Sequence, residues 1–318
     1  MIEHGTELRD LLGEQVSGAR WINALAALFT NANLYFGHGT TSAEDEAAWL
    51  VADTGGIDYA DPNWQAQFAA LVERPLTEAE QKRVIALAER RVQSRQPLAY
   101  LLNRAWFYGQ SYFVDERVLV PRSPIGALID SGFEPWLSAA AVSRVLDLCT
   151  GSGCLAINAA HRFPNAVVHA TDLSADALEV AAINVEAHQV QDRVRLMQGD
   201  LFAALPTGET YDVIITNPPY VDADEMSARP HEFRAEPELG LAAGGDGLDL
   251  ARPILRDAAE KLRPGGLLVM EVGASDEALQ AAYPTVPFTW WLSDDQGYGI
   301  LIMEREQLQA HAGALRSA

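Results

Sequence analysis

Cysteine is scarce in this chain, and histidine is nowhere clustered. The 318 residues include two cysteines, Cys149 and Cys154, with four residues between them inside a Gly-rich turn. This spacing fits neither a disulfide framework nor a paired zinc knuckle, and the seven histidines are scattered without ligand spacing. We therefore predict no metal site and interpret both cysteines as small buried residues in a reducing compartment.

Long hydrophobic runs are also missing. The longest uncharged apolar stretches are about as long as a β-strand, well short of the roughly 18 to 20 residues that span a membrane. The opening residues, MIEHGTELRD, lack the basic and then apolar pattern of a signal peptide. We expect a cytoplasmic protein with no membrane partner.

Basic residues are few compared with acidic ones. Lys and Arg number 23 against 44 Asp and Glu, which gives a net charge of -21. Such a chain repels polyanions and attracts basic partners, so we expect no stable nucleic-acid binding. Glu44, Asp45 and Glu46 could help to attract a basic protein, although a solvated helix N-terminus explains them equally well.

Residues 1–96 carry helical patterns. Apolar residues recur at helical spacing from Val16 to Phe29, and Thr77-x-x-Glu80 is a capping box that opens another helix. Pro97 marks the end of that helix. We predict a small helical N-terminal domain whose own core includes Ile22, Leu25, Phe29, Trp49, Leu71 and Val84.

Residues 97–122 form a predicted β-hairpin linker. The stretch from Tyr100 to Val120 is rich in aromatic and β-branched residues, and Gly109-Gln110 is its only turn signal. From Arg144 onward, strand patterns alternate with helical ones, which predicts an α/β fold with a mostly parallel sheet over residues 123–318. The runs 288–293 and 297–304 predict a C-terminal antiparallel hairpin, and the tail after Glu306 a loosely attached helix.

The first strand of this sheet ends in a glycine-rich turn. In open parallel sheets, ligands bind at the carboxyl ends of the strands, and Gly151-x-Gly153-x-x-Ala156 would let a ligand approach bare backbone there. A tight strand-to-helix turn and a dinucleotide site are competing interpretations. Asp147 argues against a diphosphate, because a carboxylate repels phosphate and attracts a cation such as an ammonium or sulfonium.

Two further strand ends carry acids. Asp172 stands 25 positions after Asp147, where an acid commonly binds ribose hydroxyls, and Ser174 is the better candidate for the helix cap. Asp200 could accept a hydrogen bond from an adenine amino group, with Leu201 and Phe202 beside the ring, although Gly-Asp is also ordinary turn chemistry.

The fourth strand ends in TNPPYV, residues 216–221. Asn217 offers a side-chain carbonyl and Pro218 a backbone carbonyl of fixed geometry, so the two acceptors suit one planar NH2 group. Tyr220 could stack on that group. A simple strand break would explain the prolines but neither Asn217 nor Tyr220.

At these residues the sequence resembles the class I S-adenosylmethionine-dependent methyltransferases, whose fold is Rossmann-like. NPPY is similar to the motif of enzymes that methylate planar exocyclic nitrogens. A helical domain, a hairpin and a methyltransferase domain, with VPR at 120–122 and EVG at 271–273, resemble the HemK-like protein-(glutamine-N5) methyltransferases. The run from 121 to 129 resembles the PrmB branch, which acts on the third large-subunit ribosomal protein, more closely than the release-factor branch.

The resemblance implies residue roles. The methyl donor S-adenosylmethionine, released as S-adenosylhomocysteine, would bind Asp147, Gly151, Gly153, Asp172, Asp200 and Asn217. Asn217, Pro218 and Tyr220 would hold the substrate glutamine, and an apolar or aromatic residue near 118–122 would lie against the donor. Residues 1–96 would recognise the basic ribosomal protein substrate.

Three other functions stay open at this point. A release-factor glutamine methyltransferase shares the chemistry, and a DNA or RNA adenine amino-methyltransferase shares the NPPY geometry. The net charge opposes nucleic-acid binding, and we interpret Arg90, Arg91 and Arg95 as a structural pattern at a helix C-terminus. A non-catalytic assembly factor would bind the donor without turnover.

Overall fold

The computed structural model describes residues 6–291 and 299–317, and the chain divides into two compact units. The helical unit comprises the chain up to Glu116 together with Val120–Arg122 and Pro230–Ala235. The sheet unit comprises Arg117–Leu119, Ser123–Arg229 and the chain from Glu236 onward. This division differs from the predicted boundaries at residues 96 and 122. Most of the hairpin segment belongs to the helical unit, and so do six residues far along the chain, Pro230–Ala235.

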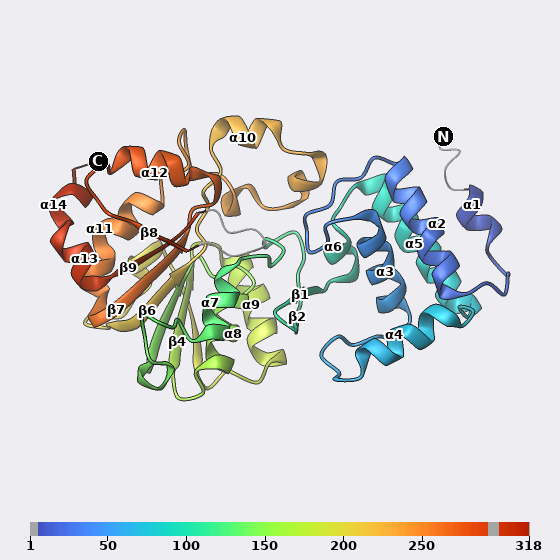
Figure 1. Ribbon diagram of the computed structural model, residues 1–318, viewed down its shortest axis with the longest axis horizontal. Helices are drawn as coiled ribbons and strands as arrows, with labels where there is room; N and C mark the ends of the chain where they lie inside the picture. The colour runs from blue at the N-terminus through green and yellow to red at the C-terminus, as the bar shows by residue number, and fades with distance from the viewer. Residues whose placement is uncertain (1–5, 292–298, 318) are drawn as a thin grey trace. The chain divides into compact units, whose positions relative to one another are not determined.

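In the part that the structure describes, the helical unit is built from six α-helices and a short hairpin (Figure 1), and its two longest helices, α2 and α5, each bury an apolar face. Thr77 and Glu80 form the predicted capping box of α5, whose last turn places Arg91 inside the unit. The predicted core residues are buried except Ile22, which is half-buried. The elements are α1 Thr6–Asp10, α2 Gly18–Asn31, α3 Ala43–Thr54, α4 Trp64–Glu73, α5 Glu78–Ser94, α6 Leu98–Leu102, β1 Ala105–Phe107, β2 Gln110–Tyr112 and the 3-10 turn η4 His231–Ala235.

The hairpin is present but shorter than predicted. Its turn is Tyr108-Gly109, with φ angles of 46° and 74°, and not Gly109-Gln110. A two-residue turn with both φ values positive matches the twist of the paired strands, so the register shifts by one residue. Tyr100 lies in helix α6 and not in a strand, because Pro97 starts a new helix there.

The sheet unit has a seven-stranded sheet in the order β5-β4-β3-β6-β7-β9-β8. The first five of these strands are parallel, and β9 pairs antiparallel with both β7 and β8. The predicted mostly parallel sheet with a C-terminal antiparallel hairpin is confirmed, while residues 292–298 of the hairpin lie outside the described residues. The strands are β3 Arg144–Leu148, β4 Val167–Asp172, β5 Val194–Gln198, β6 Tyr211–Thr216, β7 Leu262–Glu271, β8 Thr289–Trp291 and β9 Ile300–Glu304.

Helices cover both faces of this sheet (Figure 1). One face carries α7 Ile125–Ser131, α8 Cys154–Arg162 and α9 Ala175–Ala187, and the other carries α11 Ala251–Lys261, α13 Arg305–Ala310 and α14 Ala312–Leu315. The remaining elements are α10 Ala223–Ala228, α12 Asp276–Ala282 and the 3-10 turns η2 Ala139–Ala141, η3 Leu201–Ala204, η5 Glu238–Gly240 and η6 Gly273–Ser275. Within residues 6–291 and 299–317, none of the helices is long and apolar enough to cross a membrane.

The C-terminal tail corrects one expectation. Leu308 and Leu315 are 1% and 3% exposed and belong to the core beneath β7 and β9. The tail is helical, as predicted, but it is packed and not loosely attached. Its apolar residues escaped notice because two short helices show too few turns for a clear periodicity.

The strand order reverses between β3 and β6, which pair in parallel with Leu148 opposite Thr216. Strand β4 extends the sheet on the other side of β3. The carboxyl ends of these three strands therefore meet at one edge, where an open α/β sheet binds its ligands.

Candidate active site

A cavity of about 270 Å³ lies at the carboxyl ends of β3, β4 and β6 within the sheet unit. Three predicted acids or amides reach it from three strand ends: Asp172, Asp200 and Asn217. The complete lining is Arg117, Val118, Leu119, Cys149, Gly151, Thr171, Asp172, Leu173, Ser174, Ala177, Gly199, Asp200, Leu201, Asn217, Pro219, Pro237, Leu239, Gly240, Ala242, Asp249 and Leu250.

The glycine turn brings bare backbone to the cavity. Gly151 has φ +54°, and a Cβ placed there would meet nothing within 4 Å, so its backbone faces open space. Gly153, with φ +80°, is not part of the lining, and its Cβ would come within 3.3 Å of the Ala181 Cβ. Gly151 thus leaves room for a ligand, whereas Gly153 permits close packing of α8 on α9.

Asp172 binds the glycine turn and faces the cavity. Its two carboxylate oxygens accept hydrogen bonds from the backbone N–H groups of Gly151 and Ser174, each at 2.9 Å. Ser174 caps α9, as predicted, by accepting from the Ala177 N–H. Burial raises the pKa of Asp172, and the two N–H groups oppose that rise.

Asp147 lies beneath the glycine turn and is not part of the cavity lining. It is 0% exposed, and the Thr150 hydroxyl donates a 2.5 Å hydrogen bond to its Oδ2. Burial raises the pKa of Asp147 to about 7. Its predicted contact with the donor stays a prediction; through Thr150 its carboxyl group holds the turn that contains Gly151.

Asp200 and Leu201 line the cavity after β5. Phe202, which we expected beside an adenine ring, does not reach the cavity but packs against the core beneath the sheet. Leu201, which takes φ +43°, also packs against this core, but it lines the cavity as well. The apolar wall next to Asp200 therefore comes from Leu201 alone on this segment.

Asn217 and Pro219 line the cavity directly after β6, whereas Pro218 and Tyr220 do not. Tyr220 is fixed behind the cavity by contacts at both its ends. Its hydroxyl donates to the Glu271 Oε1 at 3.0 Å, and its backbone carbonyl accepts from the Ser275 hydroxyl at 2.9 Å. Its ring leaves so little space that a Cβ on Gly273 would lie 2.3 Å from it.

Glu271 is a residue of this site to which the sequence assigned no role. Its side chain lies at the end of β7 and is 7% exposed, and it also accepts a 2.5 Å hydrogen bond from the Ser123 hydroxyl. Two hydroxyl groups therefore donate to this one buried carboxylate. Glu271 of the EVG segment thus joins Ser123, which follows VPR, to Tyr220 of NPPY. These are three segments on which the family resemblance rests.

Other lining residues were also missed. Val118 and Leu119 line the cavity within the 118–122 segment, and Leu173 and Leu239 add apolar surface from two other segments; that one of them lies against the donor stays a prediction. Single apolar residues in loops follow no periodicity, so only the strand-end position of Leu173 offered a signal.

The residues present fit an S-adenosyl nucleoside. The cavity combines acids for ribose hydroxyls and a positive centre with an open glycine backbone and apolar walls. In the part of the chain that the structure describes, no three His, Cys, Asp or Glu side chains are grouped to hold a metal. Burial raises the pKa of the Cys149 thiol and lifts that of Cys154 to about 12, so neither forms a thiolate readily.

Known proteins resemble the chain along nearly its whole length. The family model of the methyltransferase small domain matches residues 129–246. The ribosomal protein uL3 glutamine methyltransferase of Neisseria meningitidis serogroup B is 45% identical over 305 residues, 95% of this chain and 94% of that protein. The protein of the same name from Bradyrhizobium diazoefficiens is 48% identical over 291 residues, 89% of each chain.

The buried acids predict a pH-dependent donor affinity. The pKa values of Asp147 and Asp172 in the folded protein both lie above the ordinary 3.8. The protonated carboxyls therefore contribute folding stability at low pH. This contribution is lost as the pH rises, up to about 7 for Asp147. A cation favours the deprotonated forms. We expect calorimetry to show that affinity for S-adenosylmethionine increases as pH rises through this window.

S-adenosylhomocysteine is the control ligand, because its sulfur is neutral, and its affinity should increase less. Asp172→Asn should weaken S-adenosylmethionine binding about tenfold, the loss of a hydrogen bond to a charged group, and flatten the pH profile. Identical pH profiles for the two ligands would exclude an electrostatic role for these acids.

The anchoring of Tyr220 predicts different effects from two glycine substitutions. Gly273 and Gly265 have φ values of +50° and +72°, so Gly→Ala strains both, yet only the Gly273 Cβ would meet Tyr220. The strain of the positive φ should cost each variant about 1–2 kcal/mol of unfolding free energy, and the contact with Tyr220 should add to the cost at Gly273. Gly273→Ala should also slow methyl transfer about tenfold or more, because Tyr220 must move. Equal rates for the two folded variants, measured alongside denaturant unfolding, would refute this role of Tyr220.

Proposed function

The chain belongs to the family of ribosomal protein uL3 glutamine methyltransferases, and from this premise we propose how its cavity works. The enzyme uses S-adenosylmethionine to methylate the side-chain nitrogen of a glutamine in uL3. In our proposal the cavity holds the donor, with Gly151, Asp172 and Asp200 as contacts and Asp147 acting from beneath. Asn217, Pro218 and Tyr220 hold the substrate amide.

One observation carries this assignment. Asn217 lines the same cavity as Asp172 and Gly151, so an acceptor for an amide group lies beside acids suited to a nucleoside with a positive centre. The β3–β6 pairing holds them at one edge. A protein that only bound uL3 would have no reason to place an amide acceptor beside a cavity for a nucleoside.

The chemistry requires orientation more than acid or base catalysis. S-adenosylmethionine, when bound, supplies a methyl group carried on a positively charged sulfur. The glutamine nitrogen is a weak nucleophile because its lone pair is delocalised into the carbonyl. The Asn217 side-chain carbonyl and the Pro218 backbone carbonyl each accept one of its N–H groups, which aims the nitrogen and increases its electron density.

Tyr220 acts as a fixed wall for the planar amide, since Glu271 and Ser275 hold its two ends. With the donor bound, the amide nitrogen held by these residues would form its bond to the methyl group as the methyl–sulfur bond broke, and S-adenosylhomocysteine would leave with a neutral sulfur. The methylated nitrogen then loses one proton to water. The acidic cavity favours the positive reactant over the neutral product, which helps product release.

The substrate also fixes the setting. A ribosomal protein is a basic partner that the net charge of -21 attracts, and we place the enzyme in the cytoplasm because ribosomal proteins are made there. We expect no stable contact with free nucleic acid and none with membranes.

We further propose that the helical domain recognises uL3 through an aromatic groove. The groove encloses about 400 Å³ and is lined by His38, Gly39, Thr40, Asp45, Trp49, Tyr59, Trp64, Ala105, Trp106 and Gly109. The Tyr59 ring lies 4.9 Å from that of Trp64 and 5.0 Å from that of Trp106. Indole and phenol rings beside a carboxylate suit an Arg or Lys side chain.

Asp45 is the acid of this groove. The hydroxyls of Thr41 and Ser42 donate to its Oδ2 at 2.9 and 2.7 Å, and these bonds lower its pKa, with Ser42 the larger cause. It is therefore charged when a basic segment arrives. Its neighbours differ, since Glu44 is exposed outside the groove and Glu46 is 2% exposed.

Asn217→Ala should lower kcat about 10²- to 10³-fold, because the amide loses one of two acceptors. Its donor dissociation constant should change only a few-fold. The substrate is unmodified uL3, the readout is peptide mass spectrometry of the methylated glutamine, and Asn165→Ala, in an exposed turn before β4, is the control. If Asn217→Ala kept its kcat and its donor affinity, Asn217 would not be the acceptor for the substrate amide.

The same assay separates the rival substrates. Unmodified release factor and adenine-containing oligonucleotides are offered in parallel with uL3. We expect label in a uL3 glutamine; label in the release factor would keep the chemistry and change the substrate, and label in adenine would overturn both.

Asp45→Asn should raise KM for uL3 about two- to fivefold, the range for one exposed charge pair, and leave kcat and donor affinity unchanged. The salt dependence of KM should weaken as well. Glu44→Gln makes the same kind of change one residue away, outside the groove, and should alter neither. Equal KM values for the two variants would exclude the groove as the docking site.

A further inference from the structure

The chain directly after NPPY forms a closed loop, residues 221–242. At its base, the Val221 N–H donates to the Leu241 carbonyl and the Ala243 N–H donates to the Val221 carbonyl, both at 2.9 Å. One end of the loop therefore adjoins Tyr220. The other end, with Pro237, Leu239, Gly240 and Ala242, lines the cavity.

The tip of this loop belongs to the helical unit. Residues 230–235 are counted with that unit, whereas Arg229 and Glu236 on either side belong to the sheet unit. Glu232 lies in the 3-10 turn η4 and is 0% exposed. A fully buried carboxylate in a surface-type loop is costly unless it is paired.

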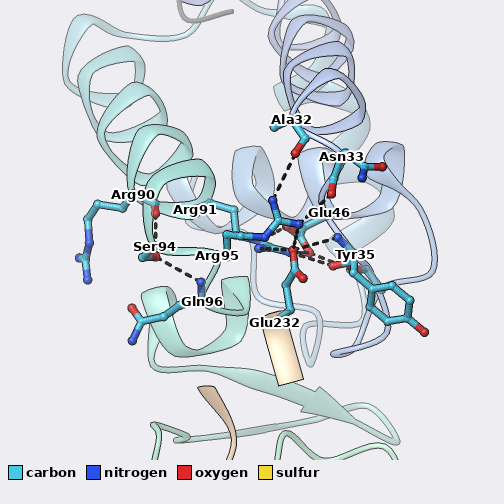
Figure 2. Close-up of polar contacts among 11 residues, drawn as sticks. Ala32, Asn33, Tyr35, Glu46, Arg90, Arg91, Ser94, Arg95, Gln96 and Glu232 are labelled. Carbon is cyan, nitrogen blue, oxygen red and sulfur yellow. Dashed lines mark hydrogen bonds and ion pairs between the residues drawn. The ribbon is translucent and has the colours of Figure 1, made fainter. Parts of the chain in front are cut away.

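Glu232 is paired with charged and polar groups of α5 and of the segment after α2 (Figure 2). Its Oε1 lies 2.6 Å from the Arg95 Nη2 and 3.9 Å from the Arg91 Nη1. The Tyr35 backbone N–H donates to the same oxygen at 3.0 Å. Arg95 is held in turn by the carbonyls of Ala32 and Asn33, at 3.3 and 2.7 Å.

Glu46 completes the charge balance of this cluster. The Arg91 Nε donates to Glu46 at 2.6 Å, and the Arg91 Nη2 donates to the Tyr35 carbonyl at 3.0 Å. Two carboxylates thus face two guanidinium groups. Removal of Glu232 would leave a positive charge on a cluster whose Arg91 side chain is 1% exposed.

Phe233 is a second anchor on the same turn. Its ring centroid lies 4.5 Å from that of His38 and 5.4 Å from that of Tyr35, and the Arg122 guanidinium lies 5.7 Å from it. Arg122 lies three positions after Leu119, which lines the cavity together with Arg117 and Val118. The η4 turn therefore contacts a residue that is close in the chain to this part of the cavity lining.

We propose that Glu232 is a positioning residue for methyl transfer. By fixing the tip of the 221–242 loop in the helical unit, it sets the conformation of the loop's two ends, at Tyr220 and at the cavity wall Pro237–Ala242. This inference rests on the proposed function.

The test compares Glu232→Gln with Glu238→Gln in the full-length protein. Both remove one carboxylate from the same loop, but Glu238 is exposed. With unmodified uL3, Glu232→Gln should lower kcat/KM about tenfold or more, with a fall in kcat, because small misplacements of a reacting group are costly. Glu238→Gln should match the unchanged enzyme, and Glu232→Asp should recover part of the rate.

Arg95→Met is a second test of the same ion pair, made from the side of the partner of Glu232. Because the Arg95 side chain is 29% exposed, its loss should disturb folding less than the loss of the buried Glu232. It should reproduce part of the loss, and the double variant with Glu232→Gln should be no worse than Glu232→Gln alone. Hydrogen exchange of peptides covering 221–242 should accelerate in Glu232→Gln. A stabilising role alone would lower the folded fraction and leave the constants of the folded enzyme unchanged.

The outcomes separate this inference from the proposed function. If the unchanged enzyme does not methylate uL3, the proposed function fails. If it does and folded Glu232→Gln has the same kcat, the same KM and the same exchange at 221–242, the positioning role is refuted. A reduced kcat with faster exchange and an unaltered Glu238→Gln supports it.

Discussion

The parallel pairing of β3 with β6 is the constraint on which the site depends. Leu148 lies opposite Thr216, and the Thr216 hydroxyl donates to the Leu148 carbonyl at 3.0 Å. The next residues, Cys149 and Asn217, therefore leave the sheet side by side, one into the glycine turn and the other into NPPY. A shift of one residue would turn every side chain of β6 to the other face, so the buried core that fixes the register also fixes the distance between donor turn and amide acceptor.

The acids of the cavity give the site an electrostatic preference. Asp172 lines the cavity and Asp147 lies fully buried beneath the glycine turn, and burial raises the pKa of each. Their charged forms are disfavoured until a positive group approaches. The turn between them is held by the Asp172 bonds to Gly151 and Ser174, so the same carboxylate shapes the backbone and faces the ligand. After transfer the sulfur is neutral, and this preference is lost.

The sequence predicted the features that are local or periodic. The strands, the capping box at Thr77 and the polar strand ends each depend on a few neighbouring residues, and the parallel topology follows from their alternation. It could not predict contacts between distant segments. Tyr35 and Glu232 are 197 positions apart, and Tyr220 and Glu271 are 51 apart. Phe202 and Gly153 are absent from the cavity lining and take part in packing, which a local pattern of residues does not show. Glu46 looked like an exposed acid because the pattern of a helix N-terminus does not show which side faces inward.

The buried charges around Glu232 suit a short segment better than apolar contacts would. Six residues cannot bury much apolar surface, and Phe233 is the only large apolar residue among Pro230–Ala235. Apolar packing is also tolerant of small shifts, whereas a carboxylate that needs the Arg95 guanidinium and the Tyr35 N–H at once has one position. We infer that the cluster fixes the position of this turn more than it adds to folding stability. One end of the loop follows NPPY and the other lines the donor cavity. A fixed position for its tip therefore matters, because a change in the loop's conformation would affect the reacting groups at both ends.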